Sequence, residues 1–250
     1  AVGHVGADIG TRMLKFAQCR KVFGTWKVAA VQVLPVVSQQ LADVSGLTGG
    51  VVSQSLTGVS LRSKGFKGQS VVAALSSAVV SPDLLELPDG DDDDLSNMVR
   101  EECEASESSS VDFWHTKPIL RGGHGMAHVN AVVMEKEHAF CCAEGLKQTG
   151  LRCDAISVQS IAMARSVELM ESSDRPIAAI DWGATAPVLC ICRNGQPEFT
   201  RVLRHSGLRT AVDAISADLG ISELEVAQLL VSYGVQAALH EGDVIGSRLN

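Results

Sequence analysis

The chain has 250 residues and a net charge of −8, and 46% of its residues are hydrophobic whereas only 4% are aromatic. This length is enough for one large domain or two smaller ones, and the shortage of aromatic residues favours α/β packing over an aromatic-rich β sandwich. No stripe of Lys and Arg is present, which argues against nucleic acid as a main partner. No stretch approaches the roughly 20 apolar residues of a membrane span, and the first residues lack the basic start of a signal peptide.

The first third of the chain is predicted to form a β-meander followed by a loop, a helix and a further strand. Apolar runs predict strands at residues 2–7, 13–20, 26–34 and 69–75. The polar, Gly-containing stretch 36–50 is predicted to be a loop. Residues 51–63 are predicted to form a helix.

The middle of the chain begins with a predicted strand, 78–87, that Pro88 ends. The acidic run Asp89–Asp94 then precedes a predicted helix at 95–105. Negative charge at the start of a helix interacts favourably with the helix dipole, and the run lacks the alternating spacing and terminal Glu of a calcium loop. We therefore expect a solvated helix start rather than a cation site.

No zinc or redox site is indicated by the sequence. The seven cysteines contain no CxxC pair, so they are interpreted as small buried hydrophobic residues of a reducing compartment. Residues 111–120 and 127–135 are predicted to pair as strands around the loop "RGGHGM". His124 and His128 lie in or next to this loop without a third ligand at metal-binding spacing, so a polar hairpin loop is predicted.

The rest of the chain alternates helices and strands. Helices are predicted at 137–150, 158–170 and 208–219, and strands at 153–157, 188–193 and 198–203. The dipeptide Asn194-Gly195 is typical of a tight hairpin turn between two such strands. Ser222 followed by Glu225 is the pattern of a capping box at the start of another helix.

One sequence pattern occurs twice. The stretch "ADIGTRMLKFAQCR" runs from Ala7 to Arg20, and "IDWGATAPVLCICR" runs from Ile180 to Arg193. Asp8 and Asp181 are 173 positions apart, and the same offset relates the Gly, Cys and Arg residues of the two stretches. A repeat at this spacing predicts two similar halves that face a common cleft.

The residue types of the repeat suit the binding of a phosphate group. An anion could be contacted by Gly10, Thr11, Lys15, Gly183 and Thr185. Glycine lets backbone N–H groups approach an anion closely, and Lys15 would add a point charge. Asp8 and Asp181 repel phosphate, so they fit this site if a magnesium ion, held through water, lies between them and the phosphates. The alternative is that both Asp residues merely cap turns.

The order of several stretches along the chain resembles the PilM-like proteins of the actin-like ATPase superfamily, which are related to FtsA. The stretches are "GADIGTRMLKFAQC", "VVAALSSAVVSPDLLELP", "NMVREECEAS", "HVNAVVMEKEHAFCCAEGLKQTGLRCDAISVQSIAMARSVEL", "AAIDWGATAPVLCICRNGQPEFTRVL" and "LGISELEVAQLLVSYG". The resemblance implies an α/β, actin-like (ribonuclease H-like) two-lobed fold with an inserted small α/β subdomain. It divides the chain into a first subdomain, 1–77 plus 154–173, an inserted subdomain, 78–153, and an incomplete second half, 174–250. The family's Gly-rich adenosine-binding loop is not found before Asn250, so the C-terminal part is expected to be truncated.

The resemblance also implies roles for individual residues. Residues 8–15 and 181–187 would be phosphate loops one and two, and the nucleotide would be bound by Gly10, Thr11, Arg12, Lys15, Gly183, Ala184 and Thr185. Asp8 and Asp181 would hold magnesium, and Gln159 would be the catalytic residue that positions water. Two residues depart from the family pattern, since Arg12 is large for its turn and Pro187 lacks an N–H group.

The implied function is that of a cytoplasmic scaffold that binds ATP with magnesium and is at most a slow ATPase. It would dock the N-terminal cytoplasmic peptide of a PilN-like membrane protein and so lie peripherally at the inner membrane. Self-association is left open. The alternatives are an FtsA-like cell-division protein, a small-molecule kinase of the same superfamily, and an interaction protein whose nucleotide site has decayed.

Overall fold

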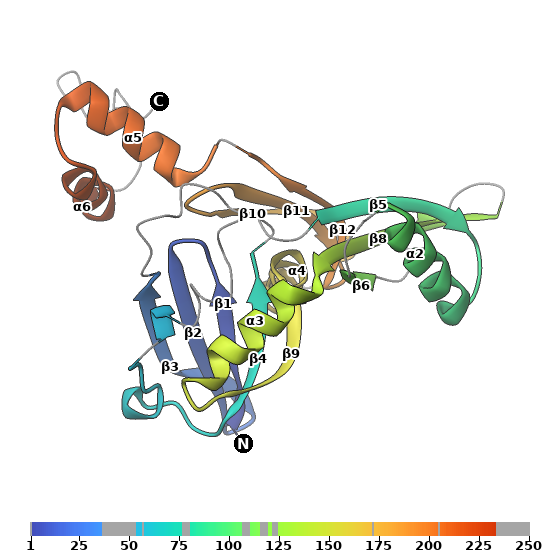
Figure 1. The fold of residues 1–250 in the computed structure, drawn as a ribbon, viewed down its shortest axis with the longest axis horizontal. Helices are drawn as coiled ribbons and strands as arrows, with labels where there is room; N and C mark the ends of the chain where they lie inside the picture. Colours follow the sequence, from blue (N-terminus) through green and yellow to red (C-terminus); the bar gives the residue numbers. More distant parts are fainter. Residues whose placement is uncertain are drawn as a thin grey trace. The chain divides into compact units, whose positions relative to one another are not determined.

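The structure is a computed structural model of the chain (Figure 1). The residues that it describes are 2–36, 54–56, 58–76, 81–106, 111–115, 120–121, 125–171, 173–204 and 206–233. They divide into two units, a larger one of residues 1–181 and 188–202 and a smaller one of residues 182–187 and 203–250.

A five-stranded sheet in the order β3-β2-β1-β4-β9 forms the base of the larger unit. Its strands are β1 (Val2–Ile9), β2 (Met13–Val22), β3 (Thr25–Pro35), β4 (Ser70–Leu75) and β9 (Arg152–Val158). The first three are the predicted meander, and β4 and β9 run parallel to β1. A two-residue turn joins β2 to β3 with positive φ at Phe23 (50°) and Gly24 (85°), the geometry that matches the twist of paired strands.

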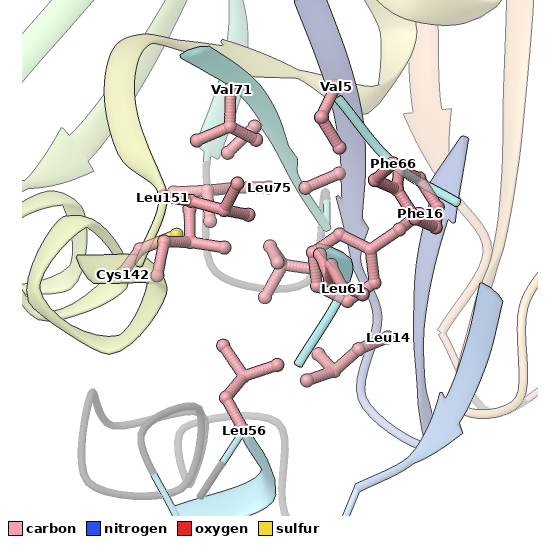
Figure 2. Packing of buried hydrophobic residues seen from close by; sticks show 14 of the residues in the cluster. Val5, Leu14, Phe16, Leu56, Leu61, Phe66, Val71, Leu75, Cys142 and Leu151 are labelled. Carbon is pink, nitrogen blue, oxygen red and sulfur yellow. The ribbon is translucent and has the colours of Figure 1, made fainter. Parts of the chain in front are cut away.

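One face of this sheet carries the main hydrophobic core. Alternate residues in parts of β1 and β2 are buried, as the period of a strand requires: Val5, Ala7 and Ile9, and Leu14, Phe16 and Gln18. Figure 2 shows Val5, Leu14 and Phe16 of the meander meeting side chains from distant parts of the sequence. These come from α3 (Lys136–Lys147), which supplies Cys142 and Leu146, and from the segment around the short 3-10 helix η2 (Arg62–Lys64), which supplies Leu56, Leu61 and Phe66.

A second sheet is built from residues of the predicted insertion. Its strands are β5 (Ser81–Pro88), β6 (Val111–His115), β7 (Leu120–Arg121) and β8 (Met126–Glu135), and each of the other three pairs with β8 in antiparallel fashion. Helix α2 (Asp92–Ser106) buries Leu95, Val99 and Cys103, which are four residues apart and so share one face. Asp91 caps the helix, because its Oδ1 accepts hydrogen bonds from the backbone N–H groups of Asp93 (3.0 Å) and Asp94 (2.8 Å). The acidic run is therefore a helix start, as predicted.

The third sheet is the second meander. It consists of β10 (Ile177–Trp182), β11 (Pro187–Arg193) and β12 (Gln196–Val202) in that order. The predicted turn joins β11 to β12 with positive φ at Asn194 and Gly195. Helix α4 (Gln159–Met170) packs against this sheet through Ala164, which lies in one buried cluster with Cys190 and Cys192.

The smaller unit contains α5 (Leu208–Leu219) and α6 (Glu223–Tyr233). Helix α5 has the predicted bounds and ends at Gly220, whose φ of 66° is typical of a helix C-terminus. The capping box before α6 is confirmed. The Ser222 N–H donates to Glu225 Oε2 (2.8 Å), and the Glu225 N–H donates to Ser222 Oγ (3.3 Å).

Some sequence predictions differ from the structure or fall outside its described part. Residues 54–56 are helical, but the helix predicted for 51–63 does not continue to residue 63, because Gly58 has a φ of 75° and no helix follows it as far as η2. The predicted loop 36–50 lies outside the described residues except for Val36. The subdomain boundaries stay a prediction. Among the described residues, no helix is long and apolar enough to cross a membrane.

Candidate functional site

Asp8 and Lys15 form the centre of the candidate site. They are direct partners across β1 and β2, on the face of the sheet opposite the buried Ala7 and Ile9. The Lys15 ammonium donates to Asp8 Oδ2 at 2.9 Å. The side chains are 52% and 36% exposed, respectively, so the pair is open to solvent and to a ligand.

The charge of Lys15 is stabilised by its surroundings. Partial burial disfavours the ammonium, but the hydrogen bond to Asp8 and the negative charges of Asp8 and Asp181 outweigh burial and raise the pKa of Lys15. Asp181 therefore lies close enough to Lys15 for its carboxylate to act on the ammonium. That Asp8 and Asp181 share one site stays a prediction.

Gln159 completes this group. It is the first residue of α4, it is half-buried, and its Nε2 donates a hydrogen bond to Asp181 Oδ2 near the end of β10. The sequence placed Gln159 in the site but did not indicate this partner, because the two residues come from different elements. Its proposed role toward water stays a prediction. In this structure its amide holds the Asp181 carboxylate.

The two Gly residues of the repeat have the same local geometry. The Gly10 N–H donates to the Met13 carbonyl at 3.1 Å, and a Cβ atom on Gly10 would lie 2.7 Å from that oxygen. A Cβ atom on Gly183 would lie 2.9 Å from the carbonyl oxygen of Ala186, again three residues later. Real Cβ atoms essentially never come this close, so both turns require glycine for their own shape. The Gly10 N–H group is occupied within its turn.

The other residues predicted for phosphate loop one lie next to this turn. Thr11 is buried, with 6% of its surface exposed. Arg12 is half-buried, and its carbonyl accepts a hydrogen bond from the Val36 N–H at 2.8 Å, which ties the turn to the end of β3.

Phosphate loop two is held by the start of α5 within the smaller unit. The carbonyls of Gly183 and Ala184 accept hydrogen bonds from the N–H groups of Leu208 (3.1 Å) and Arg209 (3.0 Å). These N–H groups belong to the first turn of the helix, where no partner exists within the helix itself. Gly207 lies so close to Ala184 and Thr185 that a Cβ atom would overlap them. The sequence analysis missed Gly207, although its place immediately before a predicted helix was a signal.

The residues of the larger unit fit a magnesium ion that is held mainly by water and phosphate. Among the described residues, no cluster of three or more His, Cys, Asp or Glu side chains is arranged to bind a metal. Two carboxylates without further ligands do not fit zinc, which needs at least three protein ligands. They fit Mg²⁺, which is commonly bound through one or two carboxylates plus substrate phosphates. Lys15 supplies the positive charge for a phosphate group.

A separate cavity of about 420 Å³ lies between α3, β8 and β9. Its lining includes Met134, Ala139, Ala143, Ile156 and Ser157. Asp154 lies at the same cavity, where hydrogen bonds from Arg152 and Ser70 lower its pKa to about 2. The Asp154 carboxylate is therefore ionised at neutral pH. No sequence motif pointed to this cavity, because its wall combines residues from three elements.

Comparison with known proteins identifies the fold. No protein-family model matches the sequence. The chain superposes on a protein in the structure of a PilM-PilN type IV pilus biogenesis complex with a TM-score of 0.74 and 22% identity, covering 92% of this chain and 70% of that one. The cytoplasmic domain of EpsL, an inner-membrane component of the type II secretion system of Vibrio cholerae, matches with a TM-score of 0.53 and 12% identity, covering 85% of this chain and 75% of that one. The chain therefore has the actin-like α/β fold of the PilM type that its sequence predicted.

Proposed function

We propose that this protein is a nucleotide-binding scaffold that docks the N-terminal cytoplasmic peptide of a PilN-like membrane protein. It would act in the cytoplasm and lie at the inner membrane through that partner. The observation that carries the proposal is the cavity between α3, β8 and β9. The fold is that of a protein solved in a complex with PilN.

The position of the cavity suits an extended peptide. Strand β9 is the last strand of the five-stranded sheet, and β4 is its only partner among the described strands. An added strand could form main-chain hydrogen bonds along the other edge of β9. The cavity next to it is lined by Ala139, Ala143 and Ala155, whose small side chains leave room for an apolar side chain of the peptide. Such a pocket would give the docking its sequence preference.

The docking proposal is tested by filling the cavity. Ala143→Leu adds an apolar side chain to the half-buried cavity wall, whereas Ala217→Leu makes the same change at an exposed position of α5. Binding of a fluorescent peptide from the N-terminus of the PilN-like partner is measured by polarisation. We expect Ala143→Leu to weaken binding at least tenfold and Ala217→Leu to leave it unchanged. Equal affinity of the wild type and both variants, with unchanged melting temperatures, would place docking elsewhere.

The nucleotide part of the proposal is supported by the group of Asp8, Lys15 and Asp181. When bound, Mg²⁺ would neutralise phosphate charge, and Asp8 and Asp181 would orient its water ligands. Lys15 would pair with a phosphate oxygen. Asp8, Asp181 and Lys15 are all assigned to binding, and none of the described residues is assigned as a general base that would activate water. We therefore expect at most slow hydrolysis of ATP.

Calorimetry with ATP, with and without magnesium, tests this second part. Asp8→Ala is expected to weaken magnesium-dependent ATP binding by about 1–3 kcal/mol, the scale of a hydrogen bond to a charged group. Equal heats in the presence and absence of magnesium would contradict the metal role of Asp8 and Asp181. No binding of ATP under either condition would favour an interaction protein with a decayed nucleotide site.

A further inference from the structure

Both carboxylates of the candidate site already have donors from the chain itself. Asp8 receives the Lys15 ammonium at 2.9 Å, and Asp181 receives the Gln159 amide. These two contacts differ in charge. The amide is neutral and can stay in place beside a cation, whereas the ammonium carries the same sign of charge as a metal ion.

Lys15 and a divalent cation would therefore compete for the Asp8 carboxylate. The negative charges of Asp8 and Asp181 both act on Lys15, which is reflected in its raised pKa. A cation bound near Asp8 would face the ammonium at close range, where like charges repel. Because Lys15 has a flexible four-carbon stem and is 52% exposed, it can move away without disturbing the core.

We propose that Lys15 is the resident counter-ion of Asp8 and that a divalent cation displaces it from this carboxylate. The released ammonium then becomes available to the anion that accompanies the metal. This inference rests on the proposed nucleotide function for that anion, but the exchange between ammonium and metal rests on the Lys15–Asp8 contact alone. Lys15 is thus a positioning residue that neutralises and holds the Asp8 carboxylate before the metal arrives.

The exchange predicts opposite effects of one substitution on stability and on metal binding. Lys15→Met removes the internal cation, so the Asp8 carboxylate loses its charged partner. In EDTA the melting temperature is expected to fall. Binding of Mn²⁺ alone, followed by electron paramagnetic resonance, is expected to become about tenfold tighter, the effect of removing one nearby like charge in a partly solvated site. Lys21→Met, at an exposed position of the same strand, should change neither quantity.

Two further variants separate the effect of the Lys15 charge from that of its hydrogen bond. Lys15→Gln keeps a hydrogen-bond donor for Asp8 without the charge, so this variant should also bind Mn²⁺ more tightly than the wild type. If Lys15→Met does not fold, Lys15→Gln provides the test of the counter-ion proposal. Lys15→Arg keeps the charge and should show no gain. An Mn²⁺ affinity that is the same for Lys15→Gln and the wild type would overturn the proposal. If Mn²⁺ binding behaves as expected but the wild type binds no ATP, the counter-ion assignment stands and the proposed nucleotide function fails.

Discussion

Asn130 is predicted to be a main polar link between the second sheet and the third. It lies on β8 with 9% of its surface exposed, and its Nδ2 donates to the carbonyls of Pro197 (2.7 Å) and Glu198 (3.4 Å) on β12. The pairing of β11 with β12 shifts by one residue at this place, since Ile191 faces Phe199 whereas Cys192 faces Pro197. Such a bulge interrupts the ladder of backbone hydrogen bonds, and the Asn130 amide supplies donors to its carbonyls.

Asn130→Ala removes this donor and leaves the buried Pro197 carbonyl without the hydrogen bond from the Asn130 amide. We expect a loss of about 1–3 kcal/mol of stability, the cost of leaving a buried polar group without its partner. For a protein of this size, about 1 kcal/mol corresponds to a shift of roughly 2–4 °C in melting temperature. Asn130→Asp should be worse than Asn130→Ala, because an ionised carboxylate can only accept hydrogen bonds and would face another acceptor.

Urea denaturation followed by circular dichroism measures these changes. Gln32→Ala is the matched control, since the Gln32 amide also donates to a backbone carbonyl, that of Val33 (2.9 Å), but at an exposed position. Its effect should stay within about 0.5 kcal/mol. If Asn130→Ala is as stable as Gln32→Ala, or if Asn130→Asp is as stable as the wild type, the Asn130 hydrogen bonds do not contribute the expected amount of about 1–3 kcal/mol to the free energy of unfolding.

Three more predictions concern a helix cap, a turn and the buried thiols. Ser222→Ala should destabilise the protein by about 0.5–2 kcal/mol through loss of the α6 cap, measured by thermal melting. Gly10→Ala should lower the melting temperature because a Cβ atom would lie 2.7 Å from the Met13 carbonyl oxygen, and an unchanged melting temperature would show that the turn can relax. Burial raises the pKa of both Cys142 and Cys190 to about 12 from 9.0, so these thiols ionise more readily in the unfolded chain. The free energy of unfolding should therefore fall above about pH 9 by roughly 1 kcal/mol per thiol per pH unit, up to the folded-state pKa, and Cys142→Ala should reduce that slope.

The elements that the sequence predicted well are those whose signals lie within a few residues. The hairpin at Asn194-Gly195, the bounds of α5 and the capping box at Ser222 each depend on local backbone chemistry, and all are present in the structure. The helix predicted at 51–63 is present at residues 54–56 but does not continue to residue 63, because Gly58 adopts a left-handed conformation that the apolar spacing of the segment did not reveal.

The contacts of the candidate site could not be predicted from the sequence. The repeat singled out Asp8, which lies opposite Lys15 across β1 and β2, and Asp181, whose charge also acts on Lys15. That these residues form one site stays a prediction. The hydrogen bond from Gln159 to Asp181 depends on how α4 meets β10, and no spacing along the chain encodes that meeting. The cavity beside β9 was missed for the same reason, since its wall is shared by three elements.

The two copies of the repeated pattern have diverged in the chemistry that they offer. Lys15 of the first copy corresponds at the same offset to Val188, which is buried with 2% exposure on β11. The lysine of the repeat is therefore present only in the first copy, beside Asp8. The second copy uses its backbone differently, because the Gly183 and Ala184 carbonyls accept hydrogen bonds from the start of α5. A change at Lys15 should thus alter ion binding, whereas a change at Gly207 should loosen the loop from its helix without removing any charge from the site.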